Sequence, residues 1–62
     1  MSKVTQFEKA FTMTADSRGL ANYVSVREEL ELGLEEFKIL VAIVSDEYDA
    51  VRVGGELYFQ VC

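Results

Sequence analysis

The stretch from Leu32 to Val44 reads LGLEEFKILVAIV and joins the most acidic part of the chain to its most apolar part. Beyond the adjacent carboxylates Glu35 and Glu36, only Lys38 carries a charge in this stretch. Apolar residues recur at i, i+3, i+7 and i+10, which is the spacing of one helix face. We therefore expect one main helix, whose inner stripe is formed by Leu34, Phe37, Val41 and Val44, with Leu40 beside it.

Three further apolar residues, Ile39, Ala42 and Ile43, fall outside this stripe. A single small sheet cannot cover a helix that is apolar on more than one side, so the helix must also contact something else. The simplest second contact is another copy of the chain. A homodimer would also suit a domain of 62 residues with a single cysteine, because so short a chain buries only about 60% of its unfolded surface and no intrachain disulfide can staple it. The predicted dimer interface comprises Leu34, Leu40, Val41, Ile43 and Val44.

Two strands are expected before the helix. Residues 5–14 could begin helically, but residues 10–14 hold Phe, Met and two threonines, a composition that favours a strand. Residues 16–19 read DSRG, which is a turn signal, and residues 20–27 again carry β-branched and aromatic residues. These segments predict a β-hairpin.

The part after the helix also predicts strands. Residues 48–53 alternate as a half-buried strand does, Gly54 and Gly55 form a two-residue hairpin turn, and residues 56–61 can return as a last strand. We therefore predict a single α+β domain, residues 1–62, with one main helix and a small antiparallel sheet of three to four strands. The expected order is β-β-α-β, with room for a further terminal strand.

Negative charge is concentrated in the middle of the chain. The formal net charge is −5, yet residues 1–27 hold four cationic residues against two acidic ones. Residues 28–49 hold eight carboxylates against Lys38 alone. A field of one sign repels nucleic acid and attracts a basic protein surface, so direct binding to DNA or RNA is not expected.

The composition also argues against an enzyme. The chain has no histidine and one cysteine, which removes the usual zinc ligand sets, and its serines have no evident base. We therefore expect no catalytic residue, metal or cofactor. No apolar run approaches the roughly 18 residues of a membrane span, and the N-terminus lacks an apolar segment of signal-peptide type. A cytoplasmic location without a membrane partner is expected.

The chain shares a pattern with a known family between residues 32 and 53. The pattern is L-x-L-x-[DE]-F-x-[VI]-L, followed by an Asp-Glu pair and then by an Arg between two aliphatic residues. In this chain the matching residues are Leu32, Leu34, Glu36, Phe37, Ile39, Leu40, Asp46, Glu47, Val51, Arg52 and Val53. With Thr12 and Met13 in the preceding segment, it resembles the small uracil-DNA glycosylase inhibitors of Bacillus phages, which act as dimeric DNA mimics. Lys38 departs from the family, which has an acidic residue there, and the chain runs further past Val53.

The resemblance implies a function. Uracil-DNA glycosylase binds duplex phosphates, flips the uracil out of the stack and inserts an apolar side chain in its place. A DNA mimic would offer carboxylates in place of phosphates and an apolar recess for the inserted side chain. The resemblance assigns Phe37 to that recess, and Glu36 matches the family's acidic residue before it. The resemblance also implies a homodimer in the cytoplasm of the phage's host cell. The predicted partner-binding residues are Glu28, Glu29, Glu31, Glu35, Glu36, Phe37, Asp46, Glu47 and Asp49.

Two alternatives stay open on the sequence. The same shape could mimic DNA toward another basic DNA-binding enzyme. The chain could also be a dimerisation or interaction module that inhibits nothing, in which case Phe37 is a core residue and the carboxylates are a solvated face.

Overall fold

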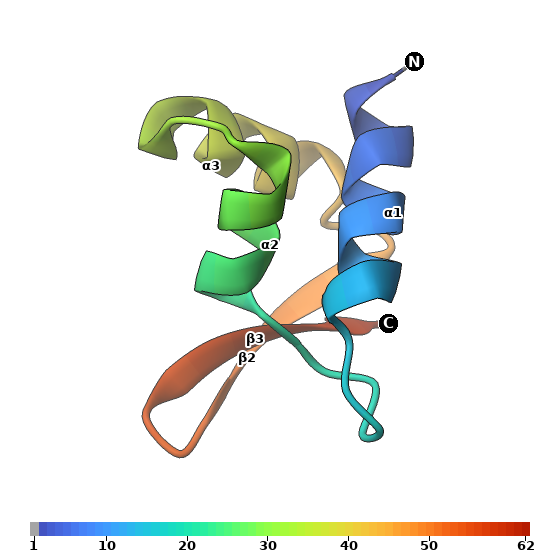
Figure 1. The fold of residues 1–62 in the computed structure, drawn as a ribbon, viewed down its shortest axis with the longest axis vertical. Coiled ribbons are helices and arrows are strands. Elements are labelled where there is room, and N and C mark those ends of the chain that lie inside the picture. Colours follow the sequence, from blue (N-terminus) through green and yellow to red (C-terminus); the bar gives the residue numbers. More distant parts are fainter. Residues whose placement is uncertain (1) are drawn as a thin grey trace.

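The computed structural model describes residues 2–62, which form three helices and a three-stranded antiparallel sheet (Figure 1). The three helices lie together on one side of the sheet, which closes the opposite end of the molecule (Figure 1). The predicted α+β class and antiparallel sheet are confirmed, whereas the prediction of a single main helix is wrong. In chain order the elements are α1 (Lys3–Thr14), β1 (Ala21–Asn22), α2 (Tyr23–Leu30), α3 (Leu34–Ile43), β2 (Tyr48–Val53) and β3 (Glu56–Val61).

Helix α1 replaces the first predicted strand, residues 10–14. Phe7, Ala10 and Phe11 are buried at i, i+3 and i+4, so one helix face supplies two aromatic rings to the core. The Ser2 hydroxyl caps this helix by accepting a hydrogen bond from the Thr5 backbone N–H at 3.2 Å. Packing of that face outweighs the local β preference of the segment.

The second predicted strand, residues 20–27, is also wrong except at its start. Only Ala21–Asn22 are in a strand, and α2 begins at once with Tyr23. The Asn22 side-chain oxygen accepts hydrogen bonds from the backbone N–H groups of Val24 at 3.0 Å and Ser25 at 3.2 Å. This N-cap turns the chain from strand to helix.

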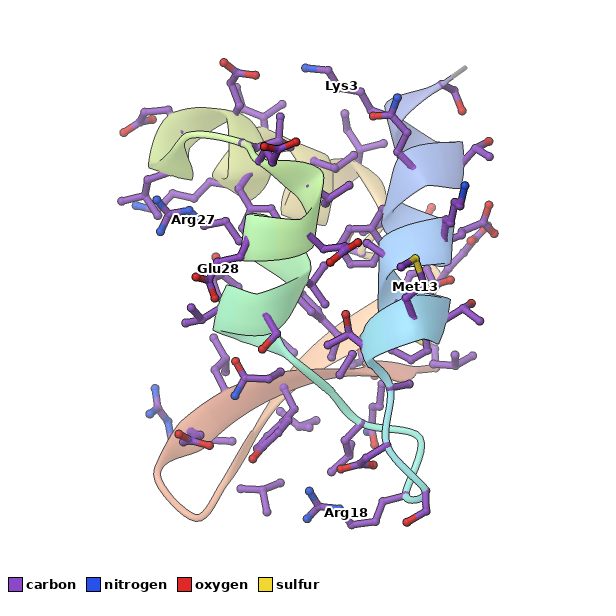
Figure 2. All side chains as sticks on the ribbon, in the orientation of Figure 1. Lys3, Met13, Arg18, Arg27 and Glu28 are labelled. Atoms are coloured by element: carbon purple, nitrogen blue, oxygen red, sulfur yellow. The ribbon has the colours of Figure 1, made fainter. Side chains whose placement is uncertain are left out.

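The turn predicted at residues 16–19 is confirmed, although it joins α1 to β1 rather than two strands. The Asp16 carboxylate accepts from the Arg18 backbone N–H at 2.8 Å, and Gly19 has a φ of +79°, which favours glycine. Figure 2 shows Arg18 at the tip of this turn. Thr12 and Met13, which the resemblance placed in a hairpin, are exposed on α1, with Met13 labelled in Figure 2.

The C-terminal half follows the prediction. Strands β2 and β3 are joined through Gly54 and Gly55, both at positive φ. β3 is the central strand, because its residue Phe59 pairs with Ala50 of β2 on one side and with Ala21 of β1 on the other.

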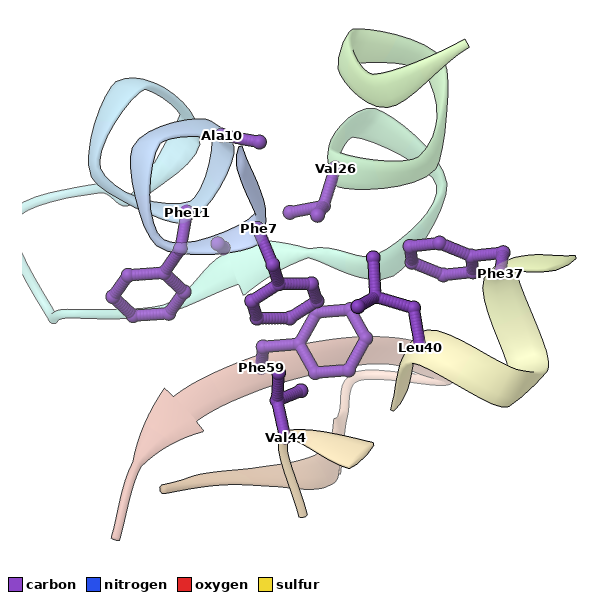
Figure 3. Packing of buried hydrophobic residues seen from close by; sticks show 9 residues of the cluster. Phe7, Ala10, Phe11, Val26, Phe37, Leu40, Val44 and Phe59 are labelled. Carbon is purple, nitrogen blue, oxygen red and sulfur yellow. The ribbon is translucent and has the colours of Figure 1, made fainter. Parts of the chain in front are cut away.

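An aromatic core ties the helices to the sheet (Figure 3). The rings of Phe7 and Phe59 meet edge to face with centroids 5.1 Å apart. Tyr23 lies 5.0 Å from Phe37 and 5.1 Å from Phe59. Each helix therefore contributes to one cluster on β3, which consists of Phe7, Ala10, Phe11, Ala21, Val26, Phe37, Leu40, Val44 and Phe59.

Candidate interaction surface

Helix α3 begins as its sequence predicts. Gly33 is its N-cap, with no side-chain cap, and its carbonyl accepts from the Phe37 backbone N–H at 2.9 Å. Glu35 and Glu36 lie in the first turn, where the positive end of the helix dipole favours carboxylates. We call these two residues, with the exposed Glu31 of the preceding connection, the N-terminal acidic group.

The connection between α2 and α3 is short and held at two points. Glu31 adopts a left-handed conformation, with a φ of 56°, and closes α2 by donating its N–H to the Glu28 carbonyl at 3.2 Å. The Arg27 guanidinium donates to the Leu32 carbonyl at 3.4 Å. These contacts set the direction in which α3 leaves α2.

A second acidic group, Asp46, Glu47 and Asp49, lies beyond the other end of α3; we call it the C-terminal acidic group. The Tyr48 N–H donates to the Val44 carbonyl at 3.0 Å, so the chain passes from helix to β2 in a tight turn. The Cys62 N–H donates to the Glu47 carbonyl at 3.0 Å, which brings the end of β3 to the same place.

The pKa values of two neighbouring groups reflect these carboxylates. Burial raises the pKa of the Tyr48 hydroxyl, and the charges of Glu8 and Glu47 raise it further. Desolvation raises the pKa of the Cys62 thiol, with added effects of Asp49 and Asp46. The Tyr48 ring also packs against Phe7 and Phe11 of α1, which brings the neighbouring Glu8 toward this end of the molecule. Glu8 is not among the residues predicted from the sequence, because it lies far away along the chain.

Glu28 and Glu29 do not belong to either group. Figure 2 shows Glu28 on the side of α2 that faces away from α1. Glu29 lines an open groove between α1 and α2, together with Lys9 and Met13. The structure therefore places these two predicted partner-binding residues on different sides of α2.

Most of the carboxylates in residues 28–49 are not neutralised by a basic neighbour. Within residues 2–62, Glu36 alone among these eight has an ion-pair partner, Lys3, at 3.6 Å. Both side chains are about three-fifths exposed, at 60% and 61%, so this pair contributes little to stability. The other ion pair of the described chain, Arg18 with Asp16, lies in the α1–β1 turn. The ends of α3 thus present a largely uncompensated negative field.

The two faces of α3 differ in burial. Phe37, Leu40 and Val44 are 0%, 1% and 3% exposed and belong to the core. On the opposite face Ile39 and Ile43 are 62% and 57% exposed. We call Ile39, Ala42 and Ile43 the outer strip.

Burial changes the role of several predicted site residues. Phe37 is fully enclosed by the core, so it lines no open recess in this structure. Leu40 and Val44, which were assigned to a dimer interface, are likewise used within the protomer, and Val41 is half-buried. Of that predicted interface only Leu34 and Ile43 are exposed.

Other kinds of site were also considered. Residues 2–62 contain no group of three or more His, Cys, Asp and Glu residues placed to hold a metal ion. No helix in the same part of the chain is long and apolar enough to cross a membrane. No family model, curated protein or solved structure matches this chain. The resemblance to the glycosylase inhibitors therefore stays a prediction, and the functional argument depends on the surface around α3.

Proposed function

We propose that this chain is a non-enzymatic DNA mimic that binds the basic DNA-binding cleft of an enzyme and inhibits it. The observation that carries the proposal is the pair of exposed acidic groups at the two ends of α3, in which only Glu36 has a basic partner within residues 2–62. Such a surface would attract a cleft built to bind phosphates.

The separation of the two groups supports mimicry of a duplex. Helix α3 has ten residues, which makes it about 15 Å long. The major groove of B-DNA, which separates two rows of phosphates, is about 12 Å wide. Carboxylates at the two ends of α3 are therefore spaced on the scale of the phosphate rows that a DNA-binding cleft contacts.

Uracil-DNA glycosylase is the target that the sequence resemblance names, and we propose it as the first enzyme to test. The structure changes which residues would meet it. Phe37 is left out because it is buried, and the exposed outer strip between the acidic groups takes its place as the apolar part of the surface. Glu28 and Glu29 are left out because they belong to α2 and not to the segments at the two ends of α3.

Homodimerisation remains a prediction. The exposure of Ile39 and Ile43 favours a partner for α3, and a second copy is one such partner. The negative field at both ends of the helix opposes it, because like charges placed opposite each other in an interface are unfavourable.

The test is inhibition of uracil excision from a labelled DNA strand by purified glycosylase. Wild-type protein is expected to inhibit, with an association rate that falls as salt is added. The double variant Glu35→Gln with Asp46→Asn is expected to inhibit about tenfold less well, a loss of about 1.4 kcal/mol. The matched control, Glu28→Gln with Glu29→Gln, removes the same charge outside the two groups and is expected to inhibit like wild type.

Two results would contradict the proposal in different ways. Absence of inhibition by excess folded protein removes the glycosylase as target, and the assay then moves to other DNA-binding enzymes. Equal losses in both double variants would mean that only net charge matters, which excludes a defined DNA-like surface. If no DNA-binding enzyme is inhibited and charge removal changes no interaction, the chain is an interaction module of another kind.

A further inference from the structure

The outer strip of α3 is an apolar surface between two acidic ends. Glu35 lies four residues before Ile39, and Asp46 lies four residues after Ala42, just beyond the helix. Positions 35, 39 and 42 therefore lie on one side of the helix, and Asp46 follows in the turn beyond its end, so the apolar residues lie between acidic ones. Both isoleucines of the strip are more than half exposed, at 62% and 57%.

The charges at the ends of the strip decide which partner fits it. If two copies met through antiparallel α3 helices, Glu35 of each would face Asp46 of the other. If the helices were parallel, each carboxylate would face its own equivalent. Both arrangements bring like charges together. Lys38 is the only cationic residue of α3, and it cannot compensate both ends.

We propose that the outer strip is the docking site for a basic amphipathic helix of another protein. Such a helix would place two or three apolar residues against Ile39, Ala42 and Ile43. Lysine or arginine residues about ten positions apart would then reach the acidic groups at the two ends, since ten helical residues span about 15 Å. Helices of this chemistry are common in DNA-binding proteins, where the basic residues contact phosphates and bases.

This inference rests on the proposed function in one respect, that the acidic groups face a basic protein. It adds that the partner's contacting element is a helix and that the apolar strip, not charge alone, defines the contact. A long helix with a basic and an apolar side meets both conditions. A nucleic acid meets neither, and a second copy of this chain offers an apolar strip on a helix but acidic ends.

The test uses a fluorescently labelled helical peptide of about 18 residues, built of leucine and lysine, with leucines at i, i+3, i+4 and i+7. A second peptide has the same composition in scrambled order, and a third has glutamate in place of lysine. Fluorescence anisotropy measures the binding of each peptide to three forms of the protein. These are the wild type, the double variant that combines Ile39→Gln and Ile43→Gln, and the single variant Val24→Gln. Val24 is 55% exposed on α2 and serves as the matched control.

We expect the amphipathic lysine peptide to bind wild-type protein at least about tenfold more tightly than the scrambled one. The double isoleucine variant should lose about tenfold in affinity while Val24→Gln keeps it, and the glutamate peptide should not bind. Circular dichroism of each variant confirms that it is folded.

Equal binding of the ordered and scrambled lysine peptides would overturn the inference, because charge alone would then explain the contact. So would sedimentation showing that wild-type protein dimerises through the outer strip and loses the dimer in the double isoleucine variant. Failure of the peptide to bind while inhibition of a DNA-binding enzyme persists would reject this inference and leave the proposed function standing. Peptide binding without inhibition of any DNA-binding enzyme would reject the proposed function alone.

Discussion

The inner and outer faces of α3 have almost the same composition but different surroundings. Phe37, Leu40 and Val44 are enclosed by α1, α2 and β3, whereas Ile39 and Ile43 have more than half of their surface exposed. Both faces lie on one helix and its C-cap residue, Val44. Apolar character alone therefore does not distinguish a core residue from a binding residue, and the distinction comes from which elements pack against the helix.

The largest expected difference between the faces is in stability. Phe37→Ala is expected to lower the free energy of unfolding by about 3 to 5 kcal/mol, because it leaves a cavity among Phe7, Tyr23 and Phe59. Ile39→Ala should change it by less than about 0.5 kcal/mol, since its side chain is exposed. Urea unfolding of both variants measures this. A large, concentration-dependent loss in Ile39→Ala would show that a second copy covers the outer face.

A smaller effect is expected at the connection that orients α3. Glu31 has a φ of 56°, a conformation that costs a residue with a side chain about 1 kcal/mol relative to glycine. Glu31→Gly is therefore expected to raise the free energy of unfolding by up to about 1 kcal/mol. The matched change Glu29→Gly, inside α2, should lower it by about the same amount. Thermal unfolding of the two variants separates them, and destabilisation by Glu31→Gly would contradict the account of this turn.

The carboxylates of the outer surface are expected to contribute less to stability. Glu35→Gln should cost about 0.3 to 1 kcal/mol, because a negative charge in the first turn interacts favourably with the helix dipole. The loss should shrink as salt is added. Denaturant unfolding at low and high salt checks this. A larger loss that salt does not change would mean that Glu35 has a structural role beyond its charge.

The smallest effect is expected at Asp16, a carboxylate that acts within the fold. The Asp16 carboxylate accepts hydrogen bonds from the Arg18 side chain and from the backbone N–H groups of Leu20 and Arg18. These bonds lower the pKa of Asp16 below its usual value. The contribution of Asp16 to the free energy of unfolding is therefore fully present above the usual aspartate pKa, and it is lost as the pH falls through the lowered pKa of the folded state. Melting temperatures measured from pH about 5 to about 2 should fall less in Asp16→Asn than in wild type.

Local sequence determined the C-terminal half and α3 well. The glycines at 33, 54 and 55 correctly marked the start of α3 and the hairpin turn. Strand β2 forms where it was predicted, but the predicted alternate burial is wrong, because only Tyr48 and Val51 are part-buried. In the N-terminal half the turn at residues 16–19 was predicted correctly but the two strands were not, because Phe7, Ala10 and Phe11 form a helix face only once β3 and α3 are present to cover them. Asn22, the N-cap of α2, is the local signal from which this helix could have been predicted.

The candidate surface was predicted only in part. The acidic stretch was identified, but its division into two groups required the path of the chain around α3. The helical spacing correctly placed Phe37 on the inner stripe and Ile39 outside it. The same stripe included Leu34, which is 46% exposed, because the exact inward face of an apolar helix depends on the rest of the fold. Glu8 could not be found from its position in the sequence, because it comes toward Tyr48 only through the packing of Phe7 and Phe11 against that ring.

The most direct test of the account is to map the contact with the amphipathic lysine and leucine peptide on isotope-labelled protein by NMR. We expect the largest backbone shift changes along residues 34–47, at both acidic ends of α3 and on the outer strip between them. The tip of the β2–β3 hairpin should change little. Changes confined to the hairpin or to the groove between α1 and α2, or an equal response to the scrambled peptide, would contradict the claim that the outer surface of α3 is the binding surface.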